Sequence, residues 1–221
     1  MPRERAVVLL AAHGERGGAA NNARLAALVA EVGTLIPEAD VGSALVSVEG
    51  LLPRTLQACQ ARPVVCLPLL FSDGYFYGER LKPHFDGKAR RLGQPLAFWP
   101  GFAPFLADNL ALRLIAHNAD PRVLLIAHGS QRPGKSAEAA RRVAVQLQAR
   151  YGRVETAFLE EAPFAREAIA RMAPPYAAVG LFFGAGLHGA EDFDVLVATA
   201  VATATFRVCN ALDPRLAPRM T

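Results

Sequence analysis

The chain contains the same sequence pattern twice, and this repeat limits the fold more than any other feature. An apolar run ends in Ala-His-Gly at residues 7–14 and again at residues 122–129, which puts His13 and His128 115 positions apart. Residues 67–74 match 179–186 at a spacing of 112, and residues 101–106 match 211–216 at a spacing of 110. Because the three matches keep their order while the spacing shrinks slowly, we infer two copies that differ by small loop deletions.

A polar stretch that ends in a proline separates the two copies. Residues 117–121 read His-Asn-Ala-Asp-Pro, and proline disfavours the continuation of a helix. We therefore predict an N-terminal lobe of residues 1–117 and a C-terminal lobe of residues 118–221. With 221 residues, of which 52% are hydrophobic, the chain has enough apolar material for buried cores and is not a disordered protein.

Each copy alternates strand patterns with helix patterns. In the second copy, residues 123–127 form an unbroken apolar run, which is typical of a parallel strand buried on both faces. We predict a helix over 137–150 with Ser136 as its N-cap, further helices over 165–172 and 193–202, and strands over 156–159, 177–183 and 205–209. This order predicts an α/β fold with two similar lobes that face each other, each a small parallel β-sheet flanked by helices.

Three titratable side chains of the second copy follow successive predicted strands. His128 ends the first strand, Glu160 follows the second with Glu161 as an alternative beside it, and His188 lies in the loop after the third. Because ligands of open α/β sheets bind at the carboxyl ends of the strands, we expect these residues to converge. Two imidazoles and a carboxylate can hold a divalent transition metal, and they can equally move protons to and from a substrate.

Glycines follow two of these strands directly. Gly129 comes after the first strand and Gly186 lies in the loop after the third. A glycine at such a place permits a sharp turn or the close approach of a ligand, and an ordinary turn is the simpler alternative.

The first copy keeps only part of this set. It retains His13, but Phe76 stands where the second copy has His188, and Glu49 is displaced from the position of Glu160. We therefore predict that the first lobe binds metal poorly by itself. The aromatic residues 75–77 are expected to form a wall of a cleft shared by the lobes, where a flat conjugated ligand stacks. The alternative is that these aromatics only pack the interface between the lobes.

Composition narrows the partners and the compartment. The net charge is +4 and arginine supplies 21 of the 24 basic residues, but no nucleic-acid motif or clustered basic stripe accompanies them. Cys59, Cys66 and Cys209 match neither a disulfide framework nor a zinc spacing, so we predict inert core thiols. No apolar run reaches the roughly 18 residues of a membrane span, and residues 6–10 read as a first strand rather than a leader. We expect a cytoplasmic protein that binds neither nucleic acid nor membrane.

The ordered motifs of the second copy resemble those of the class II tetrapyrrole chelatases. They are Ala127-His128-Gly129-Ser130, then Ala157-Phe158-Leu159-Glu160 with Pro163, then Phe182-Phe183-Gly184-Ala185-Gly186-Leu187-His188. Within that family the sequence is most similar to the sirohydrochlorin chelatases, which insert cobalt or ferrous iron in the cobalamin and sirohaem branches. The resemblance is strong over residues 122–216 and weaker over residues 6–115.

This resemblance implies the ATP-independent insertion of a divalent metal into sirohydrochlorin or a related tetrapyrrole, with no prosthetic group or redox cofactor. His128 and His188 are the implied metal ligands or proton acceptors, and Glu160 is the assisting carboxylate. The residues implied to bind the macrocycle are Gly129, Ser130, Gly186, His13 and Phe76, while Arg132 and Arg166 are candidates for its carboxylates.

The metal is a substrate of this reaction, and the sequence does not select among Co²⁺, Fe²⁺ and Ni²⁺. We expect a monomer, because a duplicated chain supplies both lobes by itself; a dimer is the alternative.

Two other functions compete with a chelatase. The segment His13-Gly14-Glu15 superficially resembles histidine phosphatases, but their chemistry requires an arginine beside the histidine, where this chain has Ala12 and Ala127. A carrier that descends from a chelatase and binds metal or tetrapyrrole without turnover is the non-enzymatic alternative.

Overall fold

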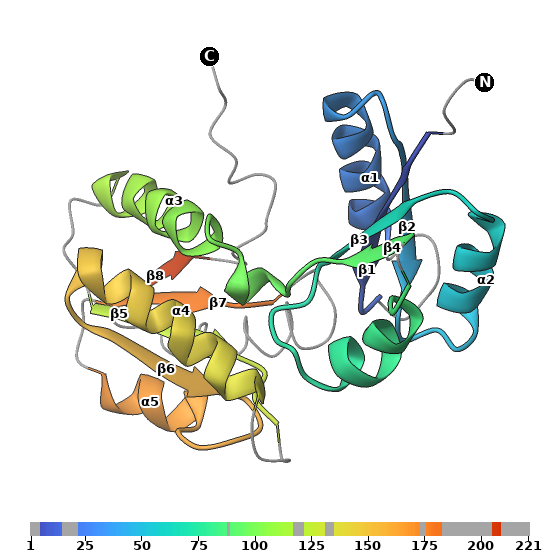
Figure 1. The fold of residues 1–221 in the computed structure, drawn as a ribbon. Helices are drawn as coiled ribbons and strands as arrows, with labels where there is room; N and C mark the ends of the chain where they lie inside the picture. The colour runs from blue at the N-terminus through green and yellow to red at the C-terminus, as the bar shows by residue number, and fades with distance from the viewer. Residues whose placement is uncertain are drawn as a thin grey trace. The chain divides into compact units, whose positions relative to one another are not determined.

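The sequence folds into two four-stranded parallel sheets of the same topology (Figure 1). The strand order is β2-β1-β3-β4 in the first sheet and β6-β5-β7-β8 in the second. The structure is a computed structural model that describes residues 5–14, 22–87, 89–116, 122–130, 135–172, 176–182 and 205–208. The two sheets confirm the predicted α/β class with two similar lobes.

The first sheet lies between two helices of its own unit. Its strands are β1 (Val7–Ala12), β2 (Asp40–Leu45), β3 (Val64–Pro68) and β4 (Arg90–Leu92), and its helices are α1 (Ala23–Leu35) and α2 (Leu51–Ala58). Short helical segments, η1 (Phe76–Leu81) and η2 (Lys82–His84), connect β3 to β4. Leu52 and Leu56 of α2 share a core cluster with Leu9 and Cys66, while α1 covers the other face (Figure 1).

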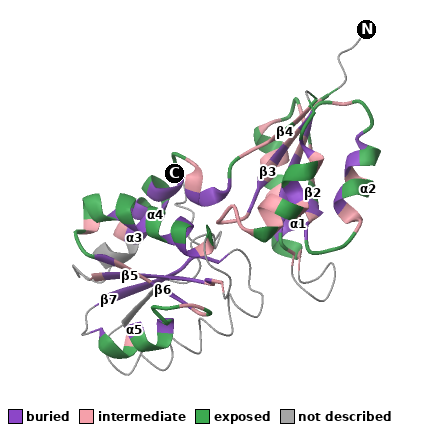
Figure 2. Ribbon diagram, turned by 60° about the horizontal axis from the view of Figure 1, so that its bottom comes forward, coloured by how far each residue is buried: buried purple, intermediate pink, exposed green. Residues whose placement is uncertain are grey.

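The second sheet has the more deeply buried centre. Its strands are β5 (Arg122–Ala127), β6 (Val154–Phe158), β7 (Tyr176–Gly180) and β8 (Thr205–Val208). Its helices are α3 (Phe102–Ala116), α4 (Lys135–Tyr151) and α5 (Ala165–Arg171), with the short segment η3 (Leu96–Phe98) before them. All residues of β5 from Val123 to Ala127 are buried, as the unbroken apolar run predicts (Figure 2). Helices α4 and α5 cover opposite faces of this sheet (Figure 1).

Several boundaries differ from the sequence prediction. Helix α4 begins at Lys135, so Ser136 lies inside its first turn and the prediction of an N-cap at Ser136 was wrong. Strand β7 ends at Gly180, although the amide of Leu181 still donates to the carbonyl of Ile126 at 2.8 Å. The helix predicted over 193–202 and the third repeat match at 211–216 lie outside the described residues.

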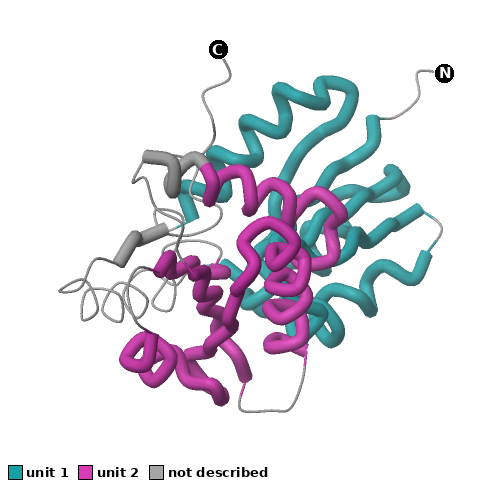
Figure 3. Tube along the Cα trace, turned by 90° about the vertical axis from the view of Figure 1, so that its left-hand side faces the viewer, with its two compact units in different colours: residues 1–96 teal, residues 97–221 magenta. Residues whose placement is uncertain are grey.

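Contacts along the chain divide it into compact units of residues 1–96 and 97–221 (Figure 3). This division comes before the predicted lobe boundary at residues 117 and 118, because helix α3 packs against α4. The hydroxyl of Tyr151 donates to the carbonyl of Ala107 at 2.6 Å, and Arg150 forms an ion pair with Asp108. A helix that the repeat assigns to the first copy therefore packs in the second unit. The lobes of 1–117 and 118–221 remain a prediction about the repeat.

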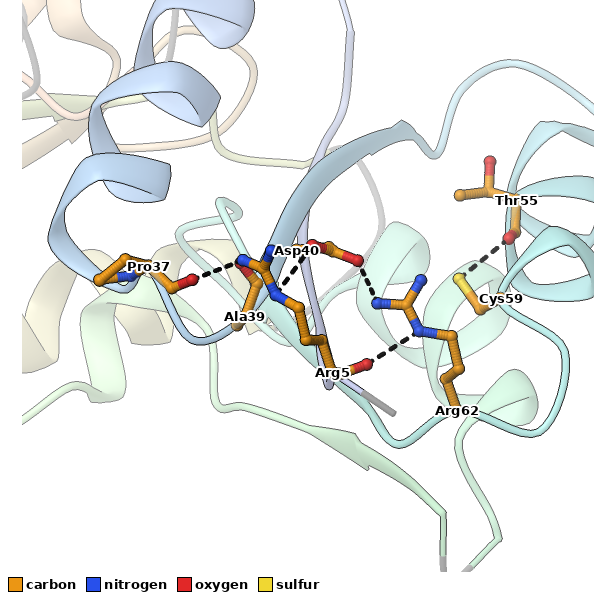
Figure 4. Close-up of polar contacts among 7 residues, drawn as sticks. All are labelled: Arg5, Pro37, Ala39, Asp40, Thr55, Cys59 and Arg62. Carbon is orange, nitrogen blue, oxygen red and sulfur yellow. Dashed lines mark hydrogen bonds and ion pairs between the residues drawn. The ribbon is translucent and has the colours of Figure 1, made fainter. Parts of the chain in front are cut away.

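Asp40 forms ion pairs with two arginines at the amino ends of the strands of the first sheet (Figure 4). His13 lies at the other end, after the last residue of β1. The Asp40 carboxylate accepts from Arg5 Nε at 3.3 Å and forms a second ion pair with Arg62. Arg62 Nε also donates to the carbonyl of Arg5 at 2.8 Å, and Arg5 donates to the carbonyl of Ala39 at 2.8 Å. These contacts join the starts of β1 and β2 to the segment before β3.

Cys59 and Cys66 are buried free thiols, as predicted. Cys59 Sγ donates to the carbonyl of Thr55 at 3.2 Å (Figure 4), and burial raises the pKa of the Cys66 thiol to about 12. Cys209 lies outside the described residues. Among the helices that the structure describes, none has the length and apolar character needed to cross a bilayer.

Candidate active site

Strands β5 and β6 bring His128 and Glu160 to the same edge of the second sheet. Ala127 and Phe158 are register partners at the carboxyl ends of these two strands. Beyond them the amide of Leu159 donates to the carbonyl of Ala127 at 3.1 Å, and the amide of Glu160 donates to the carbonyl of His128 at 3.0 Å. The pairing of the strands thus continues into the loops, which fixes where the two side chains begin.

The His128 imidazole faces the Glu160 carboxylate. His128 Nε2 and Glu160 Oε1 lie 3.7 Å apart, and each side chain is 38% exposed. This distance is too long for a direct hydrogen bond but suits an ion pair with a protonated imidazole. The pair is open to solvent, so a ligand can reach both groups. An imidazole beside a carboxylate combines a metal ligand and proton acceptor with a negative charge.

The other ring nitrogen of His128 lies 3.2 Å from the carbonyl oxygen of Gly129. When Nδ1 carries the proton, it donates to this carbonyl, and Nε2 then keeps its lone pair on the side of Glu160. In that tautomer Nε2 is available to a metal ion or a proton.

Gly129 is needed at its position. Its φ is +77°, a conformation that side chains rarely adopt, and an added Cβ would lie 2.8 Å from Phe158 Cβ and 2.9 Å from Glu161 Cγ. The backbone after β5 therefore requires a glycine here, both for its conformation and for the space around it.

The structure separates the two carboxylates that the sequence left open. Glu160 faces His128, whereas Glu161 Oε1 accepts a hydrogen bond from the backbone amide of Ser130 at 2.9 Å. The two neighbouring glutamates therefore have different partners, one a side chain and the other the backbone of the loop after β5.

The remaining predicted site residues of the second copy are only partly described. His188, Gly186 and Arg132 lie outside the described residues, and Arg166 is exposed in the first turn of α5. Within the described part of the chain, no three His, Cys, Asp or Glu side chains form a group that could hold a metal ion.

The first copy has the same backbone arrangement with different side chains. The amide of Ser47 donates to the carbonyl of His13 at 3.1 Å, and Ala12 pairs with Leu45 as Ala127 pairs with Phe158. Ser47 therefore occupies the position of Glu160, and Glu49 lies two residues beyond it, in line with the displacement expected from the sequence. The ring of His13 meets Phe76 edge-on, with the ring centroids 4.3 Å apart.

A separate crevice of about 250 Å³ lies in the first unit, between β1, β2 and α2. Its charged lining residues, Asp40 and Arg62, are already paired with each other (Figure 4). This pairing is a structural feature of the amino ends of these strands, and the crevice lies at the opposite end of β1 from His13.

Comparisons with known proteins show similarity to CbiX and SirB. The model of the CbiX family matches residues 122–217. No curated protein matches the chain by sequence. Among solved structures, CbiX described as the terminal enzyme for biosynthesis of siroheme in denitrifying bacteria is 26% identical, with a TM-score of 0.78, over 96% of this chain and 94% of that one.

Two further structures share the fold. SirB from Bacillus subtilis with Fe³⁺ is 16% identical, with a TM-score of 0.75, over 96% of this chain and 91% of that chain. The sirohydrochlorin chelatase SirB from Bacillus subtilis subspecies spizizenii, in complex with cobalt, is 15% identical, with a TM-score of 0.73, over 96% and 90%. The similarity to each of these three structures thus covers 96% of this chain.

Proposed function

We propose that this chain, whose residues 122–217 match the CbiX family model and whose motifs resemble those of class II chelatases, inserts a divalent metal ion into sirohydrochlorin or a closely related tetrapyrrole. The observation that carries the proposal is the facing pair of His128 Nε2 and Glu160 Oε1, 3.7 Å apart and open to solvent. The similarity to CbiX and SirB, with a cobalt complex and an Fe³⁺ structure among them, supports the same reaction class.

Metal insertion makes two demands on a protein. The ion must lose water ligands, and the two pyrrole N–H groups must lose their protons while the four ring nitrogens take up the metal. His128 Nε2 can take up the ion or a leaving proton, because imidazole binds borderline metals and accepts protons near neutral pH. Glu160 then balances the positive charge at that nitrogen. The two N–H protons leave as two H⁺, so no electron transfer and no ATP are required.

We propose His188 as the second imidazole of the site. Val64 starts β3, which pairs with β1, and Tyr176 starts β7, which pairs with β5, so these two residues occupy equivalent positions in the two copies. They are 112 positions apart, and the same spacing separates Phe76 from His188. Phe76 contacts the ring of His13 in the first copy. The repeat therefore supports a position for His188 toward His128.

The residues that contact the macrocycle are predicted from the sequence. Gly129, Ser130, Gly186, His13 and Phe76 are the proposed contacts to its ring. Arg166 and Arg132 are proposed for its carboxylates, because guanidinium groups bind carboxylates in a bidentate manner. We propose Co²⁺ or Fe²⁺ as the metal, for cobalamin or sirohaem biosynthesis, with Ni²⁺ as the comparison.

The test is an anaerobic absorbance assay with sirohydrochlorin and Co²⁺, Fe²⁺ or Ni²⁺, run against the uncatalysed rate. We expect an initial rate proportional to protein concentration and many turnovers per protein with at least one metal. A single stoichiometric change without turnover would identify a carrier instead. No acceleration with any of the three ions would contradict the proposal.

The phosphatase alternative has little support from the site. Ala12 and Ala127, which stand where that chemistry needs an arginine, are 2% and 6% exposed. Hydrolysis of p-nitrophenyl phosphate that disappears in His13→Ala would revive this alternative.

A further inference from the structure

We propose that Glu161 is a positioning residue, whose carboxylate fixes the loop that carries His128 and leaves Glu160 as the carboxylate that faces the reaction. The expected effect of Glu161 on catalysis rests on the proposed function. The hydrogen bond between Glu161 and Ser130 does not depend on that function.

Glu161 links two loops that are far apart in the sequence. Its Oε1 accepts the backbone amide of Ser130 at 2.9 Å, across 31 positions of the chain. On the other side of the same turn, the carbonyl of His128 accepts the amide of Leu159 at 3.1 Å and that of Glu160 at 3.0 Å. The backbone of residues 128–130 is thus held at both ends by the loop after β6.

The glycine between these two contacts lets the glutamate approach. A Cβ at Gly129 would lie 2.9 Å from Glu161 Cγ and 3.1 Å from its Oε1, closer than side chains normally come. A side chain at position 129 would therefore push Glu161 away from the amide of Ser130. The Ala-His-Gly-Ser segment and the second glutamate consequently form one structural unit.

The first copy lacks this contact. The pairing of Leu45 with Ala12 and of Phe158 with Ala127 makes Val48 the counterpart of Glu161. Val48 is 45% exposed and its side chain has no hydrogen-bond acceptor. At Gly14 the three atoms nearest to an added Cβ all belong to Leu45. The copy that has a carboxylate facing its histidine is therefore also the copy that has the second carboxylate on the loop.

Substitution by glutamine should have different effects at Glu160 and at Glu161. A glutamine side chain still accepts a hydrogen bond through its carbonyl oxygen, but it carries no negative charge. Glu161→Gln can therefore keep the contact with Ser130, whereas Glu160→Gln removes the charge opposite His128. Glu161→Ala removes the contact altogether.

The experiment compares Glu161→Ala, Glu161→Gln and Glu160→Gln in the metal-insertion assay, with Glu167→Gln on the exposed surface of α5 as the matched control. We expect kcat/KM to fall about 30-fold in Glu161→Ala and about threefold in Glu161→Gln, because misplacing a catalytic group by about 1 Å costs up to about 100-fold. Glu160→Gln should lose about 100-fold. A Glu161→Gln variant as impaired as Glu160→Gln would overturn the positioning role in favour of a charged one.

A second measurement is independent of activity. Amide hydrogen exchange of Ser130, followed by NMR, should be at least tenfold faster in Glu161→Ala than in the unmodified protein and intermediate in Glu161→Gln. Unchanged protection of the Ser130 amide in both Glu161 variants would overturn the proposal. If the unmodified protein lacks chelatase activity, the proposed function fails, while the exchange data still decide whether Glu161 holds the loop. If Glu161→Ala does not fold, the comparison of Glu161→Gln with Glu160→Gln decides instead.

Discussion

The two copies of this chain share a backbone and differ in what faces their first histidine. Both histidines follow the central strand of a four-stranded parallel sheet, and both accept an amide from the loop after the neighbouring strand. In the first copy the ring of His13 meets the edge of Phe76, whereas in the second copy His128 faces the carboxylate of Glu160. The difference teaches that the fold supplies the position of the imidazole, while two or three loop side chains decide its chemistry.

Among the changes that test the difference between the two copies, removal of the charge of Glu160 should have the largest effect. We expect Glu160→Gln to lower kcat of metal insertion by about 100-fold, because the charge opposite His128 is lost. The matched change in the first copy, Ser47→Ala, should lower kcat by less than twofold. Initial rates measured by absorbance at saturating metal check both values, and equal losses would show that the copies contribute alike.

Adding a methyl group after each histidine should distinguish the two loops by stability. Gly129→Ala places Cβ 2.8 Å from Phe158 Cβ at a φ of +77°, whereas in Gly14→Ala the nearest atom is Leu45 Cβ, at 3.1 Å. We expect the free energy of unfolding to fall by about 3 kcal/mol for Gly129→Ala and by about 1.5 kcal/mol for Gly14→Ala. Urea unfolding monitored by circular dichroism measures both, and a larger loss at Gly14 would contradict the loop geometry.

A buried thiol gives the two sheets a different response to alkaline pH. Cys66 pairs with Leu9 as Ala178 pairs with Leu124, so only the first sheet has a thiol at this place. Burial raises the pKa of Cys66 from 9.0 to about 12. The folded state therefore keeps a proton that the unfolded state loses above pH 9, and stability falls as pH rises from 9 toward 12.

Between pH 8.5 and 10.5 this linkage should cost the unmodified protein about 2 kcal/mol more than Cys66→Ala, as measured by urea unfolding at each pH. Identical pH profiles for the two proteins would show that the thiol is not buried as described.

Rebuilding the missing groups in the first copy should produce the smallest effect. The double variant Ser47→Glu, Phe76→His restores the residues that stand at these positions in the second copy. We expect weak uptake of a further equivalent of Co²⁺, detected by isothermal titration, because the backbone around His13 already matches that around His128. The single variant Phe76→His is the control, and an unchanged stoichiometry in the double variant would show that more than these side chains is missing.

Much of the fold could be predicted from sequence patterns that depend on backbone conformation and on burial. The buried residues of β5 follow from the apolar run at 123–127, and the duplicated topology follows from the repeated order of motifs. Helix starts were less predictable, because Lys135 extends α4 past the serine that reads as a cap. The packing of α3 against α4 depends on contacts between segments far apart in the chain, and no local pattern reports these.

The candidate site was predictable in its residue types and less so in their roles. His128 and Glu160 were expected to meet because parallel strands end at a common edge, and they do. The separate role of Glu161 depends on where one carboxylate oxygen lies relative to the amide of Ser130, which no sequence pattern encodes. The position of Ser47 opposite His13 was accessible from strand register, once the paired ends of β1 and β2 were known.

The most direct test compares the initial rates of metal insertion for His128→Ala and His13→Ala under anaerobic conditions. Our account predicts that His128→Ala, like His188→Ala, abolishes insertion, whereas His13→Ala loses much less. A severe loss in His13→Ala with activity retained in His128→Ala would place the reaction in the other copy and contradict the account.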